Sequence, residues 1–166
     1  MSAKQPAKDN TFDQQVIWIT GASSGIGEAL VSALSVQGAK VVLSGTSQRS
    51  FCLDTDMAVY RTMLEVNVLA QIALTKLVLP VMVEQGSGHV LVTASLAGKV
   101  GAPQRTGYCA AKHAVMGFFD ALRTEVAHLG IRVSTIVPGF IKTNIGANAL
   151  TGSGAPTGKA DADIDN

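Results

Sequence analysis

The chain reads Val-Ile-Trp-Ile-Thr-Gly-Ala-Ser-Ser-Gly-Ile-Gly at residues 16–27, where an apolar run passes directly into a glycine-rich turn. β-Branched and aromatic residues favour strands, so residues 16–20 predict a buried strand that ends at Gly21. Apolar residues at helical spacing follow as far as Gly38, and residues 40–44 predict a second buried strand. A strand, a helix and a strand within about 30 residues form a βαβ unit, which decides the fold class.

The rest of the chain continues this alternation of helices and strands. We expect a helix at 54–83, a strand at 89–94, a helix at 108–129 and a strand at 131–137. Such alternation predicts a parallel sheet covered by helices on both faces. The expected fold class is therefore α/β, a Rossmann-like doubly wound parallel sheet with about four strong strands.

Composition limits the class of protein. The 166 residues suffice for one domain, and 47% hydrophobic with 15% charged residues excludes global disorder. With a net charge of +1, the chain has no excess of basic residues that would point to nucleic-acid binding. Cys52 and Cys109 are too few for a disulfide framework and suit a reducing compartment. We expect no signal peptide, because residues 1–10 contain no apolar run, and no transmembrane segment, because Gln71, Lys76 and Pro80 interrupt the most apolar stretch, 68–83. We therefore expect a cytoplasmic or otherwise intracellular protein.

The expected domain organisation has three parts. Residues 1–13 are polar and predict a flexible arm, and residues 14–148 predict a single domain. Residues 149–166 are rich in Gly, Ala, Asp and Thr and predict a disordered tail.

The glycine-rich turn lies where a strand passes into a helix, and backbone N–H groups at a helix N-terminus can hold a pyrophosphate there. Gly21 can make the tight turn, Gly25 can let phosphates approach, and Gly27 can allow close packing of helix and strand. The spacing is G-x-x-x-G-x-G rather than the commonest dinucleotide fingerprint. A glycine-rich turn without a ligand is the alternative interpretation.

Tyr108 and Lys112 are four residues apart at the start of a helix, so their side chains share one face. A phenol with a reference pKa near 10 is a poor acid or base at neutral pH. A nearby ammonium lowers that pKa and moves the tyrosine toward general acid/base work. An ordinary helix tyrosine beside a solvated lysine is the alternative.

Two further polar residues could belong to the same site. Ser95 follows the strand at 89–94, at the sheet edge where parallel sheets bind ligands, and could hydrogen-bond a substrate oxygen or satisfy the backbone. Asn67 lies in an apolar helix and must find partners, as a structural bridge or in a proton relay. The three histidines and two cysteines show no metal-ligand spacing, so we expect no metal site.

In their order and spacing these motifs resemble the short-chain dehydrogenase/reductase family, and most closely its dehydrogenase/reductase member-7 type subgroup. The matching pieces are Thr20–Gly27, Asn67, Ser95, Tyr108–Lys112 and Pro138–Thr143. The resemblance implies an oxidoreductase that transfers a hydride between a nicotinamide cofactor and a small carbonyl or alcohol substrate. It favours NADP(H) as cofactor and leaves NAD(H) possible.

The resemblance also implies residue roles. Tyr108 would be the general acid/base, Lys112 would lower its pKa and bind the nicotinamide ribose, Ser95 would orient the substrate oxygen, and Asn67 would hold a water that relays protons. The cofactor-binding residues would be Gly21, Ser23, Ser24, Gly25, Ile26, Gly27, Tyr108, Lys112, Pro138, Gly139, Ile141 and Thr143.

The chain departs from the family between Gly45 and Asn67. Only twenty-one residues lie there, too few for the two further strands and the helix of a complete member, so we expect an internal deletion near 45–50. The far end also stops before the last family strand. One missing strand would lie beside the first strand, where the dinucleotide binds. We therefore expect a strand order of 41, 17, 90 and 133, named by one residue each, and impaired binding of the adenine half.

These departures leave a second functional hypothesis open. The chain could be a catalytically impaired fragment or splice form that acts as a binding or dimerisation module. Its two long helices, at 54–83 and 108–129, are apolar over much of their circumference and would form a homodimer contact, as they often do in the family. Related proteins can be membrane-anchored, and we expect no such anchor in this chain.

Overall fold

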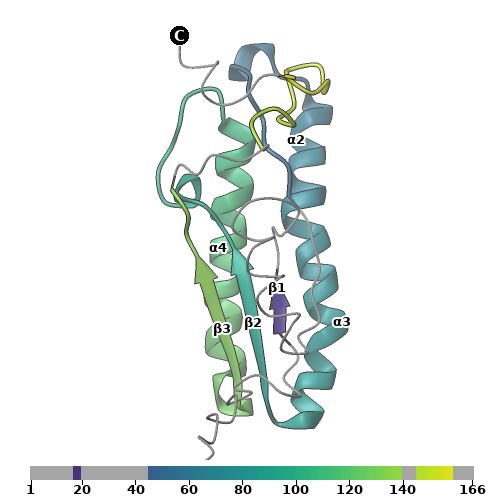
Figure 1. Cartoon of the computed structure of the whole chain (residues 1–166), viewed down its shortest axis with the longest axis vertical. Coiled ribbons are helices and arrows are strands. Elements are labelled where there is room, and N and C mark those ends of the chain that lie inside the picture. The colour runs from purple at the N-terminus through teal and green to yellow at the C-terminus, as the bar shows by residue number, and fades with distance from the viewer. Residues whose placement is uncertain (1–16, 20–44, 140–144, 159–166) are drawn as a thin grey trace, which may run out of the picture.

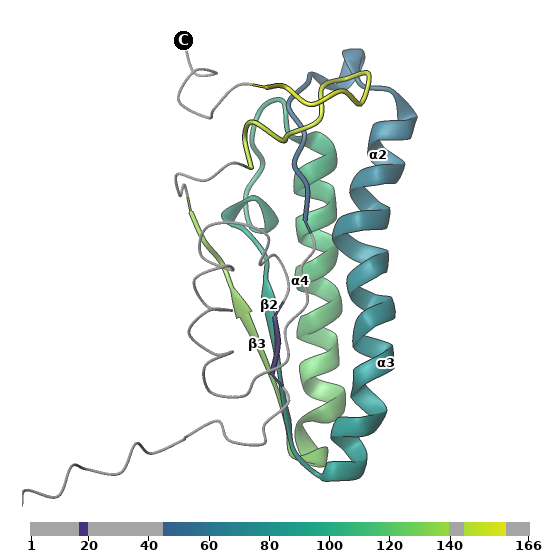
Figure 2. The same ribbon diagram turned by 45° about the vertical axis from the view of Figure 1, so that its right-hand side comes forward.

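The computed structural model describes residues 17–19, 45–139 and 145–158, and the first of these segments as backbone only. Three strands lie side by side: β1 (Ile17–Ile19), β2 (Gly88–Thr93) and β3 (Ile131–Ile136). The described helices α2 (Met57–Leu64), α3 (Ala70–Gln85) and α4 (Thr106–Val126) lie along one face of this sheet (Figures 1 and 2). The predicted helix that ends at Gly38 falls outside the described residues.

The sheet is parallel, with the order β1-β2-β3. Trp18 of β1 pairs with Val90 of β2, and Val90 pairs with Val133 of β3. The expectation that the first strand pairs directly with the strand at 89–94 is confirmed. The expected strand at 40–44 lies outside the described residues. The α/β fold class stands, because parallel strands joined through helices are its defining feature.

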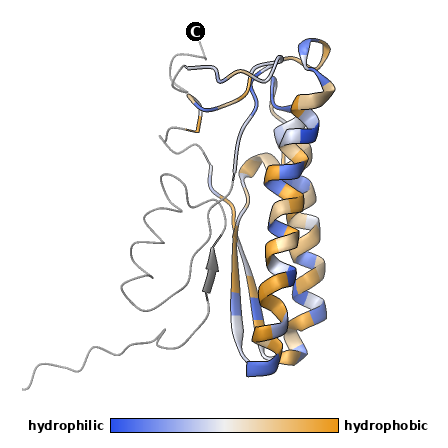
Figure 3. Ribbon diagram, turned by 90° about the vertical axis from the view of Figure 1, so that its right-hand side faces the viewer, coloured by the Kyte–Doolittle hydropathy of each residue, from blue (hydrophilic) through white to orange (hydrophobic). Residues whose placement is uncertain are grey.

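The expected helix at 54–83 is continuous from Met57 to Gln85 but has three parts. These are α2 (Met57–Leu64), a π-helical turn (Glu65–Leu69) and α3 (Ala70–Gln85). By length and composition alone this helix could cross a membrane. In the structure it lies along α4 and contributes Met63, Val68 and Met82 to the core. Apolar residues are nevertheless spread around it rather than confined to that side (Figure 3).

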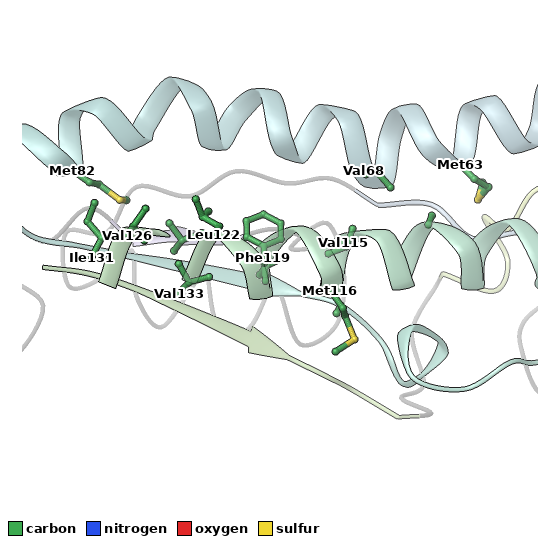
Figure 4. Packing of buried hydrophobic residues seen from close by; sticks show 14 residues of the cluster. Met63, Val68, Met82, Val115, Met116, Phe119, Leu122, Val126, Ile131 and Val133 are labelled. Atoms are coloured by element: carbon green, nitrogen blue, oxygen red, sulfur yellow. The ribbon is translucent and has the colours of Figure 1, made fainter. Parts of the chain in front are cut away.

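The second long helix, α4 (Thr106–Val126), ends in a 3-10 turn at Ala127–Leu129 and at Gly130, as the sequence predicts. Short 3-10 turns also occur at Cys52–Asp54 and Leu96–Gly98. The core lies between the helices and the strands (Figure 4). It includes the fully buried Val90, Val92, Val115 and Phe119. Apolar burial of this kind fixes α4 against the sheet and so fixes the residues at its N-terminal end.

Residues 149–158 differ from the disordered tail that composition predicts. Ala149 is fully buried, the Leu150 N–H donates to the Ser47 carbonyl at 2.8 Å, and the Arg49 N–H donates to the Leu150 carbonyl at 2.8 Å. A composition-based prediction misses this order because the backbone partners lie about 100 residues away in the sequence. The domain therefore extends beyond residue 148.

Candidate active site

Tyr108 and Lys112 lie in the first two turns of α4 and face the same way. Both side chains are buried, with 6% and 4% of their surface exposed. The Lys112 Nζ lies 5.7 Å from the centroid of the Tyr108 ring, and the Arg105 guanidinium carbon lies 6.0 Å from it. The structure therefore brings the predicted pair together, with a cation against the phenol ring.

Lys112 reaches the carboxyl end of β2. Its Nζ donates a hydrogen bond to the Thr93 carbonyl oxygen at 3.1 Å. Burial lowers the pKa of Lys112 from 10.5 to about 8, because an ammonium is less stable away from water. A lysine with this pKa is still mostly protonated at neutral pH. The site thus holds a buried positive charge beside a phenol, at the sheet edge where ligands of parallel sheets bind.

Ser95 begins the 3-10 turn Leu96–Gly98, directly after β2. Its Oγ accepts a hydrogen bond from the Ala97 N–H at 3.2 Å, so the serine caps the turn. This is the backbone role that the sequence left open, and it leaves the hydroxyl proton available for donation. Ala97 in turn packs with Tyr108 and Cys109.

Gly98 allows this turn to approach α4. A Cβ atom there would lie 2.8 Å from the Lys112 carbonyl oxygen and 2.9 Å from the Met116 Sδ. Glycine is therefore the residue that lets the Ser95 turn lie directly on the helix that carries Tyr108. The Leu96 N–H also donates to the Pro138 carbonyl at 2.9 Å, which places the predicted Pro138-Gly139 pair beside the same turn.

Asn67 is fully buried in the π-helical turn. Its Nδ2 donates to the Thr46 carbonyl at 3.0 Å and to the Met63 Sδ at 3.7 Å, while its Oδ1 accepts from the Thr46 N–H at 3.2 Å. Both donors of the amide are thus in use. This geometry supports the structural bridge, the first of the two roles the sequence left open, and gives no support for the water relay through this side chain.

The remaining predicted cofactor residues lie outside the described residues. They are Gly21, Ser23, Ser24, Gly25, Ile26, Gly27, Ile141 and Thr143. The described part of the chain therefore brings together Ser95, Tyr108, Lys112 and Pro138 at one sheet edge and says nothing of the phosphate-binding turn.

Sequence reasoning placed the segment 46–50 beside the expected deletion but did not predict its contacts with the elements that carry the site. Its backbone and side chains bond to Asn67 of the long helix, to Gln104 and Gly107 at the start of α4, and to Leu150. The available signal was a polar run after Gly45, Thr-Ser-Gln-Arg-Ser, that fits no helix or strand. Ser47 and Gln48 in this run are buried, and buried polar groups require partners.

A family model for short chain dehydrogenases matches residues 44–153, more than half of the chain. Dehydrogenase/reductase SDR family member 7B of Danio rerio is 44% identical over 119 residues, which are 72% of this chain and 38% of that protein. Human dehydrogenase/reductase SDR family member 7 is 36% identical over 197 residues, 82% of this chain and 58% of that protein. The chain spans less than two thirds of the length of either relative.

The match to the human protein includes positions that this chain lacks. The 197 aligned positions take in 82% of the 166 residues, or 136, so about 60 positions of the human protein have no counterpart here.

Solved structures agree on the fold. A short-chain dehydrogenase/reductase from Burkholderia phymatum in complex with NAD superimposes with a TM-score of 0.69 at 23% identity, over 81% of this chain and 69% of that chain. A structure from Beutenbergia cavernae with bound NADP gives a TM-score of 0.74 at 23% identity, over 81% and 76%. With its parallel sheet, the matched family model and relatives at this level of identity, the chain belongs to the short-chain dehydrogenase/reductase family.

Proposed function

We propose that this chain transfers a hydride between a nicotinamide dinucleotide and a carbonyl or alcohol substrate, with Tyr108 as the general acid/base. The observation that carries the proposal is the buried Lys112 ammonium, 5.7 Å from the Tyr108 ring centroid. Burying a cation costs free energy of folding, and a cation beside a phenol favours the phenolate form. A tyrosine that acts as a general acid/base needs such a neighbour.

The donor set at this edge suits the nicotinamide half of the cofactor. Lys112 offers an ammonium and Tyr108 a phenol, and both can hydrogen-bond ribose hydroxyl groups. The dinucleotide, when bound, supplies the hydride. NADP(H) is the proposed cofactor, as the family resemblance of the sequence motifs implies, and NAD(H) is the alternative; solved structures of this fold hold NADP in one case and NAD in another.

The proton chemistry falls to the chain's own residues. In the direction of reduction, Tyr108 donates its phenol proton to the substrate oxygen as negative charge develops there. The positive charge of Lys112 stabilises the resulting phenolate and so favours loss of the proton. The Ser95 hydroxyl, oriented by the bond from the Ala97 N–H, donates to the same oxygen and fixes its position.

A second candidate function is supported by two different observations. β1 pairs directly with β2, in the place expected for a family strand beside the dinucleotide, which supports impaired binding of the adenine half. Apolar side chains on α3 are exposed, with Leu77 at 72%, Val81 at 47% and Val83 at 41%. On this hypothesis the chain is a non-catalytic module that dimerises through α3 and α4.

Fluorescence of Trp18 separates the two candidate functions. Trp18 is the only tryptophan and lies in β1, just before the glycine-rich turn. We expect a saturable change in its emission on addition of NADPH, with a Kd weaker than micromolar because the adenine side is altered. No change with NADPH or NADH, in protein that is folded by circular dichroism, would favour the dimerisation module. Micromolar affinity would contradict the impaired adenine site alone.

A further inference from the structure

Gln48 is buried at the junction of three segments. Its side chain has no exposed surface. The Oε1 accepts a hydrogen bond from the Gly107 N–H at 2.7 Å, across 59 residues of sequence. The Nε2 donates to the Ser50 Oγ at 3.1 Å, to the Ser50 carbonyl at 3.3 Å and to the Thr55 Oγ1 at 3.1 Å. All polar atoms of this amide are therefore in use, and a single orientation satisfies them.

The bond to Gly107 supplies what α4 lacks at its N-terminus. The first N–H groups of a helix have no partner within the helix and usually receive one from a capping side chain. Arg105, the residue before α4, gives no side-chain cap. Gln48 instead bonds the N–H of Gly107, the residue directly before Tyr108. The amide oxygen also lies at the positive end of the helix dipole, which favours an acceptor there.

Gly107 is shaped to this contact. A Cβ atom at Gly107 would lie 2.8 Å from the Gln48 Oε1 and 3.0 Å from the Tyr60 ring. A side chain at this position would push the amide away, so glycine and glutamine fit each other. This close contact fixes the position of the first turn of α4 relative to the segment 46–50.

The segment 46–50 is itself fixed at several points. The Thr46 backbone bonds to Asn67, the Ser47 carbonyl and the Arg49 N–H bond to Leu150, and the Ser50 N–H donates to the Gln104 carbonyl at 3.0 Å. Gln48 therefore connects the first turn of α4 to the segment 46–50, which also bonds to the loop before the helix.

We propose that Gln48 is a positioning residue for the reaction: it sets where Tyr108 stands relative to the Ser95 turn. This inference rests on the proposed function. Gln48 touches no reacting atom. Release of the first turn of α4 would shift Tyr108 away from the substrate oxygen that Ser95 holds, and small displacements of a catalytic group reduce the rate strongly. Lys112 lies one turn further along α4 and keeps its own bond to the Thr93 carbonyl, so its ammonium stays at the site.

Gln48→Met tests the inference, because methionine keeps the length of the side chain and removes its hydrogen bonds. We expect kcat to fall about 10- to 100-fold, with the Kd for NADPH and the pH at which activity titrates unchanged. Gln48→Glu keeps an acceptor for the Gly107 N–H and should recover most of kcat. Gln71→Met is the matched control: Gln71 is equally buried and lies on α3, and its replacement should leave kcat unchanged.

A second measurement does not depend on turnover. Hydrogen exchange at the Gly107 amide of the folded protein should accelerate at least about tenfold in Gln48→Met and remain slow in Gln71→Met. Unchanged exchange at Gly107 in Gln48→Met would overturn the inference even in an inactive protein. If the wild-type chain turns over and Gln48→Met retains full kcat, the positioning role is wrong while the proposed function stands. Absence of turnover in the wild type, with accelerated exchange at Gly107, would count against the proposed function and support the structural link.

Discussion

Lys112 is a charged residue in the interior of the protein, where lysines are rarely found. The residue is 4% exposed, its ammonium donates to the Thr93 carbonyl, and burial lowers its pKa to about 8. Groups with pKa values shifted by burial concentrate at functional sites, where stability is given up for chemistry. At the scale of one residue, Lys112 is the clearest sign that α4 serves a reaction as well as the core.

Replacement of Lys112 by methionine should stabilise the protein at neutral pH. The pKa is 10.5 in the unfolded chain and about 8 in the folded one, so below pH 8 the lysine is protonated in both states and the cost of burial is fully present. That cost corresponds to at most about 3 kcal/mol. It decreases as the pH rises from 8 to 10.5, where the unfolded chain binds the extra proton and stability increases with pH.

Urea denaturation of the wild type and of Lys112→Met at pH 7 and at pH 10 measures this effect. We expect the variant to be the more stable protein at pH 7, with a smaller difference at pH 10. A less stable variant at pH 7, or a stability difference that does not depend on pH, would contradict the claim that burial of the Lys112 ammonium destabilises the folded protein.

At the scale of elements, the apolar pattern of the long helix predicts its extent but not its internal geometry. The run of apolar residues predicts its extent closely, and Gly86, with a φ of 63°, ends it. Hydrophobic periodicity does not predict the π-helical turn at Glu65–Leu69 or the bonds that join Asn67 in this turn to the backbone of Thr46, 21 residues away. Local sequence patterns predict helices and strands. They do not predict hydrogen bonds between residues that are far apart in the sequence and meet only in the folded protein.

Gln71, one turn beyond Asn67 on the same helix, should be replaceable with a gain in stability. Its side chain is fully buried, and neither amide atom has a hydrogen-bond partner within the described ranges. Such an unsatisfied group costs about 1–3 kcal/mol. Gln71→Met should therefore raise the midpoint of thermal unfolding, measured by circular dichroism. A lower midpoint would contradict the expected cost of burying this amide.

At the scale of the whole molecule, the sequence predicts the fold class and the Tyr108–Lys112 pair because both depend on short spacings. The direct pairing of β1 with β2 is favoured by counting residues and by the handedness of strand crossovers, since the 21 residues between Gly45 and Asn67 are too few for two strands and a helix. The order of residues 149–158 and the role of Gln48 could not be predicted. Both arise from contacts between segments that the sequence separates widely.

Turnover by the shortened chain tests the central claim most directly. The measurement is oxidation of NADPH by the wild type, Tyr108→Phe and Tyr60→Phe with a panel of carbonyl substrates, where Tyr60 is the chain's only other tyrosine. The account predicts activity in the wild type and in Tyr60→Phe, and a loss of about 10²- to 10⁴-fold in Tyr108→Phe with NADPH binding preserved. Equal activity in Tyr108→Phe and the wild type would contradict it.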